Sequence, residues 1–407
     1  MHPTSEFLGA RRPPRAFWMW IGAAGIAALY VASTLPTPLY PVYRTEFGIS
    51  ELTVTAIYAS YVIGNLTVLF ALGRLSDQLG RRPVTLAAFG ILLASAVCFL
   101  ASTGTAGLYV ARVLNGLAAG LGAGALTAWI AELEPAHNRA RAARVASSGN
   151  LAGLALGPLL AGLIAEYGPW PLRTSYAIYV AMLLPMMALM RATPEGVEHV
   201  VHERGSLSLR PRIGVPHEIR SAFIAPAAMA FAAFALGGFY AALTPGLLSQ
   251  SMQQHNLAVV GALVALFFGT GAAAVPITDR LQGRPAILVF AIALLSGLIL
   301  LVAAEQLRSM ATLTSATLIG GFAVALGYRG SLQIVNEIAP EAQRAEVVSS
   351  YLIVCYTANS LPVIGVGLLT IAVGAAQAHL AFAILLAVLA AIACGTGWKY
   401  TTRPQGD

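Results

Sequence analysis

The chain has 407 residues, of which 57% are hydrophobic and only 10% are charged, and its mean hydropathy is +0.74. Soluble domains carry about 25% charged residues, so this composition excludes an ordinary soluble protein and indicates an integral membrane protein. The long apolar stretches also exclude an outer-membrane barrel, whose strands are short and alternate between polar and apolar residues. The formal net charge is +7, and its meaning depends on where the basic residues lie.

Twelve apolar segments are long enough to cross a bilayer as helices, which takes about 20 residues each. They are residues 17–38, 51–72, 84–102, 105–131, 142–166, 172–191, 221–247, 255–276, 285–303, 309–336, 343–371 and 377–398. The first segment follows three Arg residues and is similar to a secretory signal, but its length and the many later spans favour an uncleaved first helix. The segments predict an all-α membrane protein with twelve transmembrane helices.

The basic residues lie almost entirely on one side of this predicted topology. With the N-terminus in the cytoplasm, Arg44, Arg173 and Arg308 fall outside, Arg112 and Arg329 fall within spans, and the remaining 19 of the 24 Lys and Arg residues are cytoplasmic. This positive-inside distribution explains the net charge without nucleic acid as a partner. It predicts a multi-pass protein with both termini in the cytoplasm, and we expect the membrane to be a bacterial inner membrane.

One polar stretch divides the spans into two sets of six. Residues 192–220 mix acidic, basic and His side chains at irregular spacing, which favours a solvated linker over a metal site. We therefore expect an N-terminal half of residues 1–191, a cytoplasmic linker of residues 192–220 and a C-terminal half of residues 221–407. The three cysteines lie inside apolar segments, which indicates that they are small core residues. Neither a disulfide framework nor a metal site is therefore predicted.

A loop motif occurs once in each half. Residues 73–83 read GRLSDQLGRRP and residues 278–285 read TDRLQGRP, so that Asp77 aligns with Asp279. Further pairs recur in the same order at offsets between 202 and 207 residues: Glu132 with Glu337, Pro158 with Pro362, and Thr37 with Thr244. The sequence therefore predicts two pseudo-symmetric six-helix halves, the pattern of transporters whose substrate site lies between their repeats.

The first copy of this motif resembles the loop between helices 2 and 3 of the major facilitator superfamily of membrane transporters. The match covers Gly73, Asp77, Gly80, Arg81 and Arg82. Gly73 can end one helix and Gly80 permits a tight turn before the next. The resemblance implies a fold of this superfamily and a cytoplasmic gate that latches the two halves together in the outward-open state.

The second copy of the loop is weaker. Asp279 and Arg284 are its expected gate residues, but Gln282 and Gly283 stand where the first copy has Gly80 and Arg81. The stronger cytoplasmic latch is therefore expected in the N-terminal half.

Two further segments resemble motifs of the same superfamily. Residues 112–120, RVLNGLAAG, are similar to its motif of an Arg followed by Gly at four and eight positions, which implies a role for Arg112 in proton or substrate coupling. Residues 149–162 resemble the antiporter motif of the twelve-helix drug/proton antiporter branch, which implies a hinge or seal formed by Gly153, Gly157, Pro158 and Gly162. Snorkelling of Arg112 to the surface and plain helix packing are the alternatives.

The tenth predicted span breaks the repeat. Arg329 and Gln333 stand where the fourth span has Gly124 and Ala128. A guanidinium against lipid would cost about 2.5–3.5 kcal/mol, so Arg329 is expected to face a cavity or a partner, with snorkelling as the alternative.

The acidic residues also bear on the substrate, because none lies near the centre of a predicted span. Many exporters of cationic drugs in the resembled superfamily carry a carboxylate in the first helix, and this chain has none there. Two deep Arg residues without a deep acid favour an anionic, zwitterionic or neutral polar substrate.

We expect a secondary transporter that works by alternating access, with proton-coupled export of a small organic molecule or drug as its activity. The alternative is proton-coupled or facilitated uptake of an organic anion or sugar. A sensor or a membrane enzyme lacks support, because the predicted spans contain no cluster of nucleophiles or metal ligands. The nucleotide-binding pattern GxxxxGK[ST] is absent, so we do not expect this chain to drive transport with ATP. No cofactor is predicted, and a monomer suffices for this architecture. The residues expected to bind substrate or couple ions are Arg112, Arg329, Gln333, Asn115, Tyr30 and Tyr240.

Overall fold

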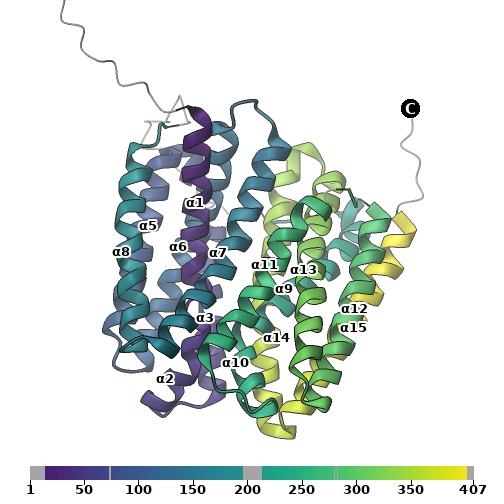
Figure 1. Cartoon of the computed structure of the whole chain (residues 1–407). Coiled ribbons are helices and arrows are strands. Elements are labelled where there is room, and N and C mark those ends of the chain that lie inside the picture. Colours follow the sequence, from purple (N-terminus) through teal and green to yellow (C-terminus); the bar gives the residue numbers. More distant parts are fainter. Residues whose placement is uncertain (1–13, 73–74, 196–212, 279, 282, 401–407) are drawn as a thin grey trace, which may run out of the picture.

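The protein folds into a bundle of long helices. The computed structural model describes residues 14–72, 75–195, 213–278, 280–281 and 283–400. Within these ranges it contains helices and no strands, and twelve of the helices are long and apolar enough to span a membrane. Figure 1 shows the helices of the N-terminal half and those of the C-terminal half as two groups that meet along the middle of the bundle. The predicted all-α membrane architecture is confirmed.

Six long helices form the N-terminal half. They are α1 (Arg15–Thr34), α3 (Glu51–Ala71), α5 (Arg81–Ala101), α6 (Thr105–Leu133), α7 (Arg139–Tyr167) and α8 (Pro171–Ala192). Short helices connect them: η1 (Thr37–Leu39) and α2 (Tyr40–Phe47) precede α3, and α4 (Leu75–Leu79) precedes α5. Side chains cap the N-termini of α3 and α7. Ser50 accepts a hydrogen bond from the Thr53 N–H at 3.1 Å, and Asn138 accepts one from the Arg141 N–H at 3.0 Å.

The C-terminal half also has six long helices. They are α9 (Arg220–Ala242), α11 (Leu257–Thr278), α12 (Gly283–Leu307), α13 (Met310–Ile338), α14 (Arg344–Val373) and α15 (Ala375–Tyr400). Short helices precede or connect them: η2 (His217–Ile219) before α9, α10 (Thr244–Gly246) and the π-helix η3 (Leu247–Ser251) before α11, and η4 (Glu341–Gln343) before α14.

Two helices end earlier than the apolar segments predict. The first segment was expected to reach residue 38 and the seventh residue 247, but α1 ends at Thr34 and α9 at Ala242. Pro36 and Pro245 follow these ends, and proline has no N–H to continue the helical hydrogen bonds. Hydropathy alone does not register this break.

The long helices alternate in direction, so their ends form two faces of the bundle. We call the end at which α1 begins and α15 ends the termini face, and the opposite end the far face (Figure 1). Arg44 in α2, Arg173 at the start of α8 and Arg308 between α12 and α13 all lie at the far face.

The two halves are joined toward the far face. Thr37 donates a hydrogen bond to the Ala241 carbonyl at 2.7 Å. Gln250 in η3 donates to Glu51 at the start of α3, also at 2.7 Å. The N–H of Leu257, the first residue of α11, donates to the Glu166 carboxylate at 2.8 Å. We call this set of contacts the far-face seam.

Candidate functional site

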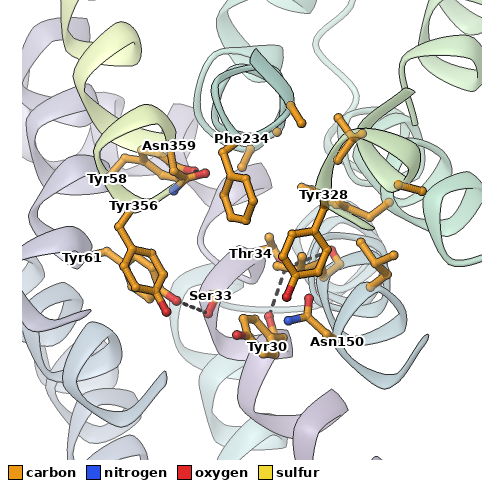
Figure 2. Close-up of a pocket in the computed structure, with 18 of the residues that line it drawn as sticks. Tyr30, Ser33, Thr34, Tyr58, Tyr61, Asn150, Phe234, Tyr328, Tyr356 and Asn359 are labelled. Carbon is orange, nitrogen blue, oxygen red and sulfur yellow. Dashed lines mark hydrogen bonds between the residues drawn. The ribbon is translucent and has the colours of Figure 1, made fainter. Parts of the chain in front are cut away.

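A cavity of about 150 Å³ lies between the two halves, on the termini side of the far-face seam. Figure 2 shows tyrosine, phenylalanine and asparagine side chains converging on it from both halves. The N-terminal half contributes Tyr30, Ser33, Thr34, Tyr58, Tyr61, Arg112, Asn150, Leu151 and Leu154. The C-terminal half contributes Ala233, Phe234, Gly237, Ala241, Phe268, Val324, Ala325, Tyr328, Leu352, Tyr356 and Asn359.

Arg112 in α6 supplies the charge of the cavity. Its side chain is buried and donates to the carbonyl oxygens of Ser33 at 2.9 Å and Tyr58 at 3.2 Å. The rings of Tyr58 and Tyr61 lie 5.1 Å from the guanidinium carbon, close enough for cation–π attraction. Among the described lining residues, Arg112 is the one charged side chain. The cavity therefore carries a positive charge that no lining carboxylate offsets.

Hydrogen bonds organise the polar side of the cavity. The Tyr58 hydroxyl donates to the Asn359 amide oxygen at 3.2 Å, which links α3 of one half to α14 of the other. Ser33 donates to the Tyr61 hydroxyl at 3.5 Å (Figure 2). These hydroxyl and amide groups have spare hydrogen-bonding capacity, so the cavity can accept a polar organic molecule.

The wall from the C-terminal half is mostly apolar and aromatic. Phe234 of α9 and Tyr328 of α13 pack edge to face, with ring centroids 5.5 Å apart. Small residues of the same helices, including Ala233 and Ala325, complete this wall and leave room beside the rings. An aromatic wall opposite a polar one suits a planar amphipathic molecule.

Two of the residues expected to bind substrate or couple ions line this cavity, and two lie in the helix cores. Tyr30 and Arg112 are lining residues. Asn115 is fully buried in α6, and its amide nitrogen and oxygen have no hydrogen-bond partner in the described part of the protein. Tyr240 is buried in the C-terminal half, where it stacks on Phe267 and shares a hydrogen bond of 3.2 Å with Thr317.

Arg329 and Gln333 lie nearer the termini face than the cavity does. Arg329 donates to the Val275 carbonyl at 2.6 Å and to the Thr278 hydroxyl at 3.2 Å, so it stabilises the last turn of α11. A cation is favourable at this end of a helix, where carbonyl groups lack intrahelical partners. Gln333 donates to Glu337 one turn further along α13. The sequence pattern predicted a cavity or a partner for Arg329 but did not indicate that it contacts the end of α11.

The loop motif of the N-terminal half forms a charged network at the termini face. Arg81 pairs with Asp77 and also donates to Glu132 at 2.9 Å and to Ser76 at 3.0 Å. These contacts join the loop to the end of α6. Gly80 has a φ of 99°, a left-handed conformation that glycine adopts without strain.

Glu195 extends this network, and the motif gave no sign of it. Its carboxylate accepts the backbone N–H groups of Arg81 at 2.8 Å and Arg82 at 3.1 Å. A carboxylate is favourable at the N-terminus of a helix such as α5. Because Glu195 lies more than 100 positions after the loop, no local spacing connects the two.

The second copy of the loop is described only in part. Asp279 lies outside the described residues, as does Gly73 of the first copy. Arg284 is the second residue of α12. Gly283 occupies the place of Arg81 and cannot form the ion pairs that Arg81 makes.

The segment similar to the antiporter motif packs α7 against two helices. A Cβ atom on Gly153 or Gly157 would collide with the backbone of α1, so these glycines allow close approach within the N-terminal half. Further along α7, Gly162 and the Pro158 carbonyl lie against Gly261 of α11 in the other half. Backbone therefore meets backbone where α7 and α11 cross.

Comparison with known families decides what kind of protein has this architecture. The chain matches the family model described as Major Facilitator Superfamily over residues 22–362. The chain belongs to the major facilitator superfamily. It is thus a multi-pass membrane transporter, in a family of transporters rather than enzymes.

Characterised and uncharacterised transporters share part of this sequence. The quinolone resistance protein NorA of Staphylococcus aureus is 27% identical over 143 residues, which are 35% of this chain and 36% of NorA. The uncharacterized MFS-type transporter MT1926 of Mycobacterium tuberculosis is 30% identical over 147 residues, 36% of this chain and 21% of that protein. The chain thus spans only about a third of the length of NorA in this match.

Solved transporter structures share the fold over nearly the whole chain. A bacterial homologue of the human lysosomal transporter Spinster, in an inward-facing and unoccupied conformation, has a TM-score of 0.74 at 13% identity, covering 98% of this chain and 100% of that one. The human organic anion transporter MFSD10 (TETRAN) has a TM-score of 0.66 at 18% identity, covering 94% and 100%. At these identities the likeness establishes the fold alone.

Proposed function

We propose that this transporter exports a small organic molecule of anionic or polar character through the central cavity, in exchange for protons. The observation that carries the proposal is the position of Arg112, a buried cation that lines a cavity shared by both halves. A buried cation favours a ligand carboxylate or another anionic group nearby. The aromatic wall would hold the apolar part of the same molecule.

The proposed direction of transport rests on two observations. The segment from Gly149 to Gly162 resembles the motif of drug/proton antiporters, and part of the chain is similar to the quinolone resistance protein NorA. Both favour export over uptake.

The far-face seam supports alternating access as the mechanism. We infer that the termini face lies in the cytoplasm, because most Arg and Lys residues lie on that side of the predicted topology. The hydrogen bonds at Thr37, Glu51 and Glu166 then close the cavity from outside. Opening to the outside would break these contacts. The described partners of Arg81 all lie within residues 76–195, so the loop would latch the cytoplasmic side only by gaining contacts to the C-terminal half in that state. In this scheme Arg329, Gln333 and Arg284 belong to the cytoplasmic gate rather than to the substrate site.

A ligand series that changes only charge tests the proposed substrate class. Benzoate, benzamide and benzylamine share one ring and differ in charge, so their effect on the thermal unfolding of purified protein separates charge from shape. We expect benzoate to stabilise the protein most and benzylamine least. Arg112→Gln should abolish the preference for benzoate. Stronger stabilisation by benzylamine would contradict an anionic substrate.

Vesicles test direction and coupling. In everted vesicles that are acidic inside, we expect uptake of the best stabilising acid, together with release of protons from the lumen. A pH-sensitive dye reports the proton movement. Accumulation only in right-side-out vesicles under an inward proton gradient would support proton-coupled uptake and refute export.

A further inference from the structure

A buried ionisable pair lies at the far face of the C-terminal half, apart from the central cavity. Nδ1 of His379 in α15 lies 3.0 Å from one carboxylate oxygen of Glu305 in α12. The other carboxylate oxygen accepts a hydrogen bond of 2.5 Å from the Ser251 hydroxyl. The side chains of His379 and Glu305 are only 7% and 11% exposed.

Within the described residues, no other charged side chain makes an ion pair or a hydrogen bond with His379 or Glu305. Phe239 of α9 packs its ring edge to face with His379, at 5.3 Å between centroids. Tyr240, which follows Phe239 in the sequence, is the ionisable residue of α9 in the part of that helix near the far face. His255 and Arg308 lie in nearby connections, and both are exposed.

α13 and α14 pack against the helices that carry the pair, and their ionisable groups lie elsewhere. The ionisable residues of α14 lie in the half of the helix that is nearer the termini face: Arg344, Glu346, Tyr351, Cys355 and Tyr356. Those of α13, which are Tyr328, Arg329 and Glu337, lie toward that face as well. Glu305 and His379 therefore depend on each other for charge balance.

The pair is connected to the far-face seam through η3. Ser251, which donates to Glu305, is the last residue of this π-helix, and Gln250 directly before it donates to Glu51 of the N-terminal half. A π-helical turn inside a helical segment is uncommon and often marks a functional position. The segment is thus held on one side by Glu51 and on the other by Glu305.

We propose that Glu305 and His379 form a proton-binding site that closes the far face of the transporter. With a proton on His379, the pair is an imidazolium and a carboxylate with no net charge, and it can stay buried under η3. Loss of that proton leaves a buried carboxylate without a countercharge, which is unfavourable in a low-dielectric interior. Admitting water by moving η3 away relieves this, and the movement separates Gln250 from Glu51.

The inference deepens the proposed function and rests on it in one respect, since the far face must be outside the cell. External acid would then load the site and close the outer side, the step that an antiporter needs after releasing its substrate. Histidine suits this task because it changes charge near neutral pH. The site would supply the protonatable group that the first helix lacks.

Distances between spin labels at the far face test the proposal directly. Thr45→Cys in α2 and Ala376→Cys in α15 place labels on the two halves, in a background with Cys98, Cys355 and Cys394 changed to Ala. Pulsed electron paramagnetic resonance then follows the distance between them from about pH 5 to about pH 8, the range in which histidine titrates. We expect the distance in otherwise unchanged protein to increase as the pH rises.

Two variants are expected to shift this response in opposite directions. Glu305→Gln removes the charge that needs compensation, so the far face should stay closed across the whole pH range. His379→Gln removes the countercharge, so the far face should stay open until a more acidic pH than in the parent protein. Matched controls at exposed far-face positions, Glu46→Gln and His255→Gln, should keep the parent response.

Each outcome bears on one proposal. A distance that does not change with pH, or variants that follow the parent, would overturn the proton-binding site. Size-exclusion chromatography identifies folded protein, and if Glu305→Gln does not fold, the His379→Gln variant alone decides the question. If the distances respond as expected but vesicles show no proton-driven flux, the site stands and proton-coupled export fails.

Discussion

The two halves share one scaffold but place different chemistry at equivalent positions. Arg112 in α6 aligns with Thr317 in α13 at the repeat offset that also pairs Glu132 with Glu337. Arg112 brings a positive charge to the central cavity, whereas Thr317 shares a hydrogen bond with Tyr240 inside the C-terminal core. The two halves therefore share the helix arrangement, whereas the charge among the described lining residues of the cavity comes from the N-terminal half.

The largest expected effect comes from removing the positive charge of Arg112, by which the N-terminal half differs from the C-terminal half. Arg112→Ala should reduce transport of an anionic substrate at least about tenfold, because a charge-assisted hydrogen bond contributes about 1.5–3 kcal/mol. Flux in vesicles and ligand-induced thermal shifts measure this loss.

Thr317→Val is the matched control in the other half. It should leave transport nearly unchanged, because Thr317 packs away from the cavity. Equal losses from the two substitutions would contradict the idea that one half carries the substrate charge.

An intermediate effect is expected where equivalent helices differ in packing. Gly157→Ala in α7 would force a Cβ atom into the backbone of α1, and overpacking of this kind costs about 1–3 kcal/mol. Gly365 in α14, the corresponding helix of the C-terminal half, has no atoms within 4 Å of a Cβ position. Thermal unfolding in detergent should therefore show a loss for Gly157→Ala and none for Gly365→Ala.

The smallest expected effect concerns the loop of the N-terminal half, which has the stronger copy of the motif. Arg81→Ala removes the contacts to Asp77 and Glu132 and should lower the free energy of unfolding by about 1 kcal/mol, since the site is partly exposed to solvent. Arg82→Ala should leave stability unchanged, because the Glu195 carboxylate binds the backbone rather than the side chain of Arg82. Unfolding curves at low and high salt check both, and the Arg81 effect should shrink at high salt.

Much of the fold could be predicted from the sequence, because membrane spans depend on local composition. The twelve apolar segments correspond to the twelve long helices, and the family that the loop at Asp77 resembles is the one that the family model confirms. The ends of α1 and α9 were placed too far along the chain because proline, rather than hydropathy, ends them.

The candidate functional residues were harder to predict because they depend on which helices meet. Residues far apart in the chain meet where α7 crosses α11. The hydrogen bond from Tyr58 to Asn359 likewise joins distant parts of the chain. Glu305 and His379 are 74 positions apart. Each lies near the end of its span, where polar residues are common and do not indicate a functional site. The spacing along α13 marked Arg329 as unusual but did not indicate that it contacts the end of α11.

The crossing of Gly162 and Gly261 has a consequence for how fast the two halves can move. Most helix interfaces interlock through side chains, so sliding them requires several rotamers to change together. At this crossing backbone touches backbone, and neither Gly162 nor Gly261 has a side chain to rearrange. A rotation about this point would need few rotamer changes at the contact itself, so the hydrogen bonds of the far-face seam, which such a movement would break, would do more than the pivot to set the speed of the conformational cycle.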